Sequence, residues 1–145
     1  PKKTVYIKQF DRELPLPQYK TIAAAAFDLT ARATVVIKPR KVGYVPLNVA
    51  IKVPPGHFLL LAARSSTHKM GLILANGIGI GDPDFSGDND EYHAAYYNVS
   101  NRAVTIKRGE RVAQALIVRA DRVVWREVAS MQRKTRGGFG TTGNA

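Results

Sequence analysis

Short apolar runs, separated by proline, glycine, asparagine and aspartate, recur along most of the chain. Valine, isoleucine and tyrosine enrich these runs, and such residues favour β-strands. The predicted strands are Val5–Gln9, Thr34–Ile37, Val45–Val53, Phe58–Ala62, Leu72–Leu74, Tyr92–Tyr97, Val104–Ile106, Arg111–Val118 and Val123–Val128. Several short strands at such intervals are typical of a β-barrel or jelly roll rather than of alternating strands and helices. We therefore expect one all-β domain.

One segment leaves the choice between helix and strand open. Ile22–Ala31 holds four consecutive alanines, which favour a helix, but it continues with Phe27-Asp28-Leu29-Thr30. Because this second part has strand-forming character, the prediction for the segment is a strand.

The segment from Gln132 to Ala145 has a different composition, rich in glycine, threonine and arginine, with Phe139 as its single large apolar residue. This composition predicts a folded domain over residues 1–131 and a flexible arm over residues 132–145. Glycines expose backbone N–H groups to phosphate oxygens, and an aromatic ring can cover a base. A mobile arm of this kind is able to close over a bound nucleotide.

Composition narrows the class of protein. The 145 residues suffice for one domain with a real core, and no apolar run approaches the roughly 18 residues of a membrane span. The first residues lack the long apolar stretch of a secretory signal. The absence of cysteine excludes disulfides, thiolate catalysis and cysteine-based metal sites, and His57, His68 and His93 lack metal-ligand spacing. A cytoplasmic enzyme without a membrane partner is expected.

The formal net charge is +11, from 22 Lys+Arg against 11 Asp+Glu. A net positive charge of this size attracts polyanions, and both nucleic acid and a nucleoside triphosphate are polyanions. The charge is spread along the chain except for Arg133, Lys134 and Arg136, and neither an RNA-binding signature nor a helix-turn-helix pattern accompanies it. Nucleic acid is therefore not the expected partner, and most of the charge is interpreted as solvated surface.

The residues best suited to bind a ligand or react with it are concentrated between Ala63 and Gly87. It begins with Arg64, Ser65 and Ser66, a positive charge and two hydroxyls that can hold an anion. A strand-like run and a glycine-alternating segment follow, whose backbone a ligand can approach closely. Asp82 and Phe85 then supply a candidate base and a stacking ring. Together these groups suit a nucleotide and its phosphates.

Five separated segments, in this order, resemble the five motifs of the trimeric dUTPases. They are Ala26–Ala31, Arg64-Ser65-Ser66 with Gly71, Asn76–Gly87, Gly109–Gln114 and the Gly138-Phe139-Gly140 arm. Each motif alone is weak, but five in order over nearly the whole chain are specific. The resemblance implies a distorted jelly-roll homotrimer whose active sites each use more than one subunit. It also implies hydrolysis of dUTP to dUMP and pyrophosphate, with Mg²⁺ held on the triphosphate.

The resemblance implies a role for each matching residue. Asp82 matches the carboxylate that orients and deprotonates the attacking water, and Phe85 matches the aromatic that packs on the deoxyribose and excludes a 2′-hydroxyl. The structural alternatives are an Asp-Pro turn for Asp82 and a core position for Phe85. Asp28 matches an acid that braces the phosphate site, through Mg²⁺-bound water or purely structurally. The other expected substrate-binding residues are Arg64, Ser65, Ser66 and Gln114 for phosphate, Asn76, Gly79 and Ile80 in the uracil hairpin, and Arg136, Phe139, Gly140 and Thr141 in the arm.

Three features depart from the dUTPase pattern. The spacing from Arg64 to Gly71 and the Asp82-Pro83 turn look more like the sister family, the dCTP deaminases. The segment Gly87–His93 carries extra residues, which predicts an enlarged hairpin tip. The arm is compressed, so more than one of its basic residues can take the place of the family's arm arginine.

These departures leave two alternatives beside a dUTPase. The first is a dCTP deaminase or a bifunctional deaminase and dUTPase, which needs a glutamate three residues before the asparagine that ends the following strand. That asparagine matches Asn98, and the glutamate position is Ala95, which cannot shuttle a proton; Glu91 would need a different register. The second is a non-enzymatic nucleotide-binding regulatory trimer, for which the enlarged tip would be a contact.

Overall fold

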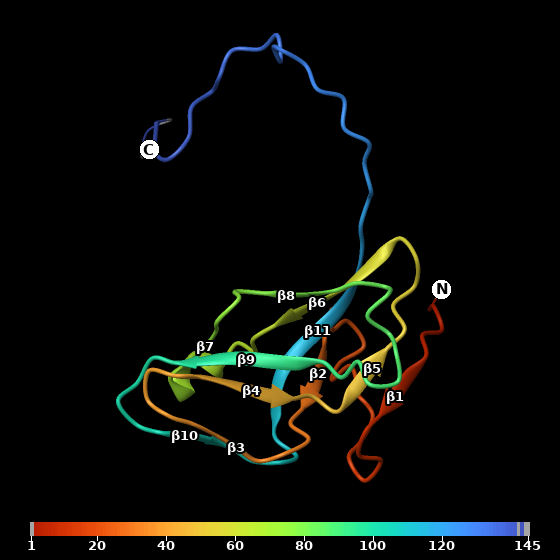
Figure 1. Ribbon diagram of the computed structural model, residues 1–145, viewed down its shortest axis with the longest axis vertical. Helices are drawn as coiled ribbons and strands as arrows, with labels where there is room; N and C mark the ends of the chain where they lie inside the picture. The colour runs from red at the N-terminus through yellow and green to blue at the C-terminus, as the bar shows by residue number, and fades with distance from the viewer. Residues whose placement is uncertain (1, 142, 144–145) are drawn as a thin grey trace.

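The computed structural model describes residues 2–141 and 143, and these residues form an all-β fold with one short 3-10 helix (Figure 1). Strands β7 and β10 coincide with their predicted ranges, and most others differ from prediction by a residue or two at their ends. The elements are β1 (Ile7–Gln9), β2 (Phe27–Thr30), β3 (Val35–Ile37), β4 (Val42–Pro46), β5 (Val49–Ile51), β6 (His57–Ala62), η1 (Thr67–Met70), β7 (Leu72–Leu74), β8 (Gly79–Gly81), β9 (His93–Asn98), β10 (Val104–Ile106) and β11 (Arg111–Arg119).

Two larger sheets enclose the core, one with the order β2-β11-β6-β8 and one with the order β4-β9-β7. Two antiparallel pairs, β1-β5 and β10-β3, flank them. Leu29, Leu61 and Ala113 from the first sheet and Val45 and Tyr96 from the second belong to one buried cluster. The alternation that buries Phe27 and Leu29 turns the side chains between them to the opposite face of the sheet. This alternation places Asp28 outside the core, where it can take part in a site.

The predicted strand Val45–Val53 is two strands, because the chain bends at Asn48. Asn48 has φ 73°, and its side chain accepts a hydrogen bond from the Asp11 backbone N–H at 2.6 Å and donates one to the Asp11 carbonyl at 3.0 Å. Asparagine tolerates this left-handed conformation better than most residues do. The bend was hidden in the sequence because nearly every neighbouring residue is apolar and buried.

The strand predicted at Val123–Val128 is wrong. Beyond β11 the chain leaves the domain in an extended path (Figure 1), and Val124 and Trp125 are 98% and 90% exposed. A strand needs a neighbour that pairs with its backbone groups, and nothing in the described part of this chain lies beside the segment. In the ambiguous segment Ile22–Ala31, only Phe27–Thr30 forms a strand, and the preceding residues form turns and bends.

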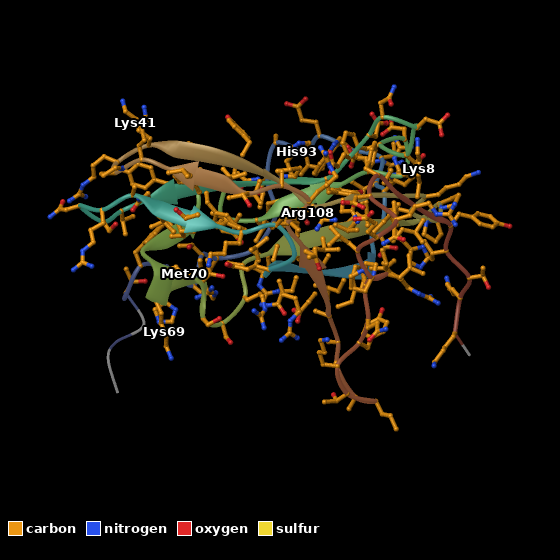
Figure 2. All side chains as sticks on the ribbon, turned by 90° about the horizontal axis from the view of Figure 1, so that it is seen from below. Lys8, Lys41, Lys69, Met70, His93 and Arg108 are labelled. Carbon is orange, nitrogen blue, oxygen red and sulfur yellow. The ribbon has the colours of Figure 1, made fainter. Side chains whose placement is uncertain are left out.

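Basic side chains lie at opposite ends of the domain. Figure 2 shows Lys41 and Lys69 at one end and Lys8 at the other. This distribution agrees with the interpretation of the net charge as solvated surface. No helix in the described part of the chain is long and apolar enough to cross a membrane.

Candidate active site

A cavity of about 320 Å³ lies where the chain turns from β7 of one sheet into β8 of the other. Asn76, Gly79, Ile80 and Phe85 line it, all of them predicted substrate-binding residues. The remaining lining residues are Leu61, Glu91, Tyr92 and His93. The cavity thus combines exposed backbone, an amide side chain and two aromatic rings, which suits a nucleoside.

Glycines allow the chain to turn tightly between β7 and β8 and allow β8 to lie close to β6. Gly77 has φ +75°, and its N–H bonds to the Leu74 carbonyl at 3.1 Å. Gly79 pairs with Leu61, and a Cβ added at Gly79 would lie 2.9 Å from the Leu61 Cβ. A side chain at either position would strain or displace the backbone, so the glycines fix the shape of the cavity wall.

Asp82 and Phe85 are joined by a turn that directly follows β8. The Phe85 N–H donates to the Asp82 carbonyl at 3.0 Å, and the Asp82 side chain is exposed. The chain therefore does make the turn that sequence analysis gave as the structural alternative for Asp82, and the turn leaves the carboxylate open to solvent. Phe85 is 38% exposed and is not a core residue.

Tyr92 lies behind this turn, and its part in the site was not predicted from the sequence. Its ring packs edge-on against Phe85, with centroids 5.2 Å apart and planes at 68°. Burial and the negative charges of Asp82 and Asp90 raise the pKa of the Tyr92 hydroxyl to about 12. In the sequence, Tyr92 begins a predicted apolar strand, and that position predicts a core residue rather than a site residue.

A second group of predicted residues gathers around Asp28. Arg64 Nε lies 3.3 Å from Asp28 Oδ1, and Arg111 Nη1 lies 3.2 Å from Asp28 Oδ2. Arg64 also donates from Nη1 to the Arg111 carbonyl at 3.1 Å. The Asp28 side chain is 15% exposed, so both ion pairs are partly shielded from water.

The strand register brings these residues together. Asp28 of β2 faces Gln114 of β11, and Gln114 in turn faces Ala62 at the end of β6. Gln114 donates from Nε2 to the Ala63 carbonyl at 2.9 Å, directly before Arg64. Three segments that are far apart in the sequence therefore contribute an acid, an amide and a guanidinium to one patch.

Ser65 and Ser66 are exposed between β6 and η1. Ser66 occupies the N-cap position of η1, but its side chain makes no capping hydrogen bond there. Their exposed hydroxyls lie next to Arg64 in the chain, where they can donate to phosphate oxygens. Among the described residues, no group of three or more His, Cys, Asp or Glu side chains could hold a metal ion.

The structure does not bring all predicted site residues together. The lining of the 320 Å³ cavity includes none of Asp82, Arg64, Ser65, Ser66 and Gln114. Arg136, Phe139, Gly140 and Thr141 lie on the extended arm, away from the domain (Figure 1). One chain thus presents a nucleoside-sized cavity, a basic patch and an arm as three separate parts.

Glu91, which was considered as a deaminase acid in a different register, is a structural anchor. It is 8% exposed and accepts hydrogen bonds from Arg32 Nε at 2.7 Å, Arg32 Nη2 at 2.9 Å and the Asn48 backbone N–H at 2.9 Å. These contacts fasten the Gly87–His93 tip to the core. Its partners lie far away in sequence, so no local signal pointed to this role.

The chain matches the family model described as dUTPase over residues 12–143. It is 34% identical to a deoxyuridine 5′-triphosphate nucleotidohydrolase of Dictyoglomus turgidum, over 96% of this chain and 97% of that protein. Its fold resembles a mutant dUTPase of Staphylococcus bacteriophage 80alpha with dUpNHpp, at TM-score 0.85, 20% identity and coverage of 99% and 100%. It also resembles a mutant dUTPase from phage phi11 of S. aureus that coordinates a structural Mg(II) ion, at TM-score 0.79, 18% identity and coverage of 90% and 100%.

Proposed function

The chain belongs to the dUTPase family and is a dUTP diphosphatase, and from this premise we propose that Asp82 activates the water that attacks dUTP. The products are dUMP and pyrophosphate. The observation that carries this proposal is the turn from Asp82 to Phe85, which leaves an exposed carboxylate on the segment that joins β8 to Phe85, both of which contribute to the cavity wall. An ionised carboxylate at neutral pH accepts a proton from water, and it must hold that water in line with the α-phosphorus, opposite the leaving pyrophosphate.

The nucleoside occupies the cavity beside the turn between β7 and β8. Asn76 and the backbone around Gly79 and Ile80 supply hydrogen bonds to the uracil edge. The half-exposed ring of Phe85 packs on the deoxyribose and leaves no space for a 2′-hydroxyl. This fit is supported by the volume of the cavity and by its mixture of backbone and aromatic walls.

The triphosphate binds at the patch around Asp28. Arg64 grips phosphate oxygens with its fork of donors, while Ser65, Ser66 and Gln114 add directed hydrogen bonds. Asp28 positions Arg64 through the ion pair at 3.3 Å.

Mg²⁺ fits this patch as an ion carried on the triphosphate. Asp28 is engaged by two arginines, and Mg²⁺ commonly takes few protein ligands beside phosphate oxygens and water. Asp28 would contact such an ion through its bound water. When bound, the ion neutralises charge that develops on the phosphates.

The complete enzyme is a jelly-roll homotrimer in which residues 1–131 form the domain and residues 132–145 form an arm that closes over the site. The separation of cavity, basic patch and arm in one chain supports an active site shared between subunits. The segment after β11 exposes large apolar side chains, including Val124, Trp125 and Met131. A cavity of about 1040 Å³, lined in part by Val5, Tyr19, Ile22 and Ile117, gives a second copy apolar surface to cover.

One assay tests the proposed activity against its alternatives. The chain is incubated with Mg²⁺ and either dUTP or dCTP, and the products are identified. We expect dUMP and pyrophosphate from dUTP and no product from dCTP. Ammonia released from dCTP indicates a deaminase, and absence of product from both nucleotides favours a non-enzymatic regulator.

A further inference from the structure

Tyr92 is a buried tyrosine in the wall of the nucleoside cavity. It is 6% exposed, and its ring meets Phe85 edge-on at 5.2 Å between centroids. Phe85, by contrast, is 38% exposed and lies at the end of a turn. An exposed ring on a turn can rotate unless another side chain packs against it. The Tyr92 ring packs against Phe85 in this way.

The Tyr92 hydroxyl occupies the space that a side chain on Gly81 would fill. A Cβ added at Gly81 would overlap the hydroxyl oxygen and lie 2.7 Å from ring carbon Cε1. Gly81 is buried and pairs with Leu59 of β6, so making room for a side chain there would disturb the pairing of β8 with β6. Gly81 and Tyr92 are therefore complementary in volume, and Tyr92 reaches under β8 only because residue 81 is glycine.

The Tyr92 hydroxyl is buried away from water and has no hydrogen-bond partner among the described residues. An unpaired buried hydroxyl is unfavourable, whereas phenylalanine would fill the same space without that cost. The contribution of Tyr92 to the site is therefore assigned to its ring, which makes the contact with Phe85.

We propose that Tyr92 is a positioning residue for sugar selection, whose ring holds Phe85 in the orientation that excludes a 2′-hydroxyl. The edge-on geometry fixes the plane of the Phe85 ring, since aromatic pairs favour this arrangement over a random one. This inference rests on the proposed function, because it takes Phe85 to be the ring that packs on the deoxyribose.

The test compares how variants discriminate between deoxyribose and ribose. Dissociation constants are measured for the non-hydrolysable α,β-imido analogues of dUTP and UTP, and kcat/KM is measured for dUTP and UTP. Tyr92→Phe keeps the ring and should retain the preference for the deoxy form of the unaltered chain. Tyr92→Leu removes the ring and should reduce the preference at least about tenfold, mainly through improved acceptance of the ribonucleotide.

Because Tyr92→Leu leaves a void under β8, a second variant guards against a loss of folding. Gly81→Ala combined with Tyr92→Leu returns a methyl group to that void, so the pair should be more stable than either single variant. Thermal unfolding at fixed protein concentration measures this. The double variant should fold well and still show the reduced preference, since the contact with Phe85 is absent.

Phe85→Leu serves as the reference for complete loss of the ring. Added to the double variant, it should cause little further loss of preference, because the two residues act as one unit. Unchanged preference in a well-folded double variant overturns the inference, and so does loss of preference in Tyr92→Phe. A failure of the unaltered chain to hydrolyse dUTP contradicts the proposed function instead, and it is measured in the same preparations.

Discussion

Arg64 and Asp28 form an ion pair at 3.3 Å, although Arg64 follows β6 by two residues, Asp28 belongs to β2, and β6 and β2 are not adjacent strands of the sheet. β11 lies between those strands, and Arg111 from β11 completes the contact with the second Asp28 oxygen at 3.2 Å. The arginine proposed to grip phosphate is thus already oriented in the free chain. Such pre-organisation lowers the entropic cost of binding a charged ligand.

Replacing Asp28 by asparagine tests this pre-organisation. The amide keeps the shape but not the charge, so Arg64 and Arg111 repel one another without a shared anion. We expect the KM for dUTP to rise about tenfold, equivalent to roughly 1.4 kcal/mol of binding, with a smaller change in kcat. Asp11→Asn is the matched control, because it breaks an ion pair with Arg108 rather than with Arg64. An unchanged KM in Asp28→Asn contradicts the positioning role.

Asp82→Asn tests the proposed base. The variant should bind dUTP within a few-fold of the unaltered chain, because the cavity and the basic patch are untouched. Its kcat should fall about 10²–10⁴-fold, the usual contribution of a general base. Asp84→Asn, an exposed neighbour in the same turn, is the control and should keep most of the turnover. Substantial turnover by Asp82→Asn would remove this residue from the mechanism.

Truncation after Arg133 tests the arm. It removes Arg136, Phe139, Gly140 and Thr141 but keeps the apolar segment that contains Trp125. We expect kcat/KM to fall by about a hundredfold, because a site that lacks its covering segment loses positioning and exclusion of water. The chain should still elute as a trimer in gel filtration. A monomeric elution would assign the arm to assembly rather than to catalysis.

The pair of Asp11 and Arg108 predicts a pH dependence of stability. Arg108 donates to Asp11 Oδ2 from Nη2 at 2.6 Å and from Nε at 3.1 Å, and this holds the Asp11 pKa below its ordinary value of 3.8. A carboxyl with a lowered pKa in the folded chain stabilises that chain above its unfolded pKa, and the contribution disappears as the pH falls through the folded value.

Urea unfolding at pH 7 and below pH 4 measures this effect in the unaltered chain and in Asp11→Asn, at one protein concentration. The unaltered chain should have the higher unfolding midpoint at pH 7, and the two midpoints should converge in acid. A difference that stays constant down to pH 2 would show that the Asp11 charge is not its source.

Local patterns in the sequence predicted most of the strands, and the resemblance to the family pointed to Asn76, Gly79, Ile80 and Phe85 in the wall of the 320 Å³ cavity but not to Tyr92. The apolar runs at Leu72–Leu74 and Val104–Ile106 form strands with the predicted bounds, and the chain turns at Asn76-Gly77 between β7 and β8. Alternation of side chains between the two faces of a strand, and the conformational freedom of glycine, are properties of neighbouring residues. Such properties are visible in a sequence without any knowledge of the fold.

Pairings between distant segments were decided by the tertiary structure alone. The register of β2 on β11 brings Asp28 to Arg64 and Arg111, and the folded tip brings Glu91 to Arg32. Val123–Val128 has the sequence of a strand but pairs with no other segment among the described residues, so it remains extended and exposed. Sequence determined which segments can be strands, because that depends on local side-chain pattern; tertiary structure determined which groups meet, because backbone pairing and ion pairs depend on what lies opposite.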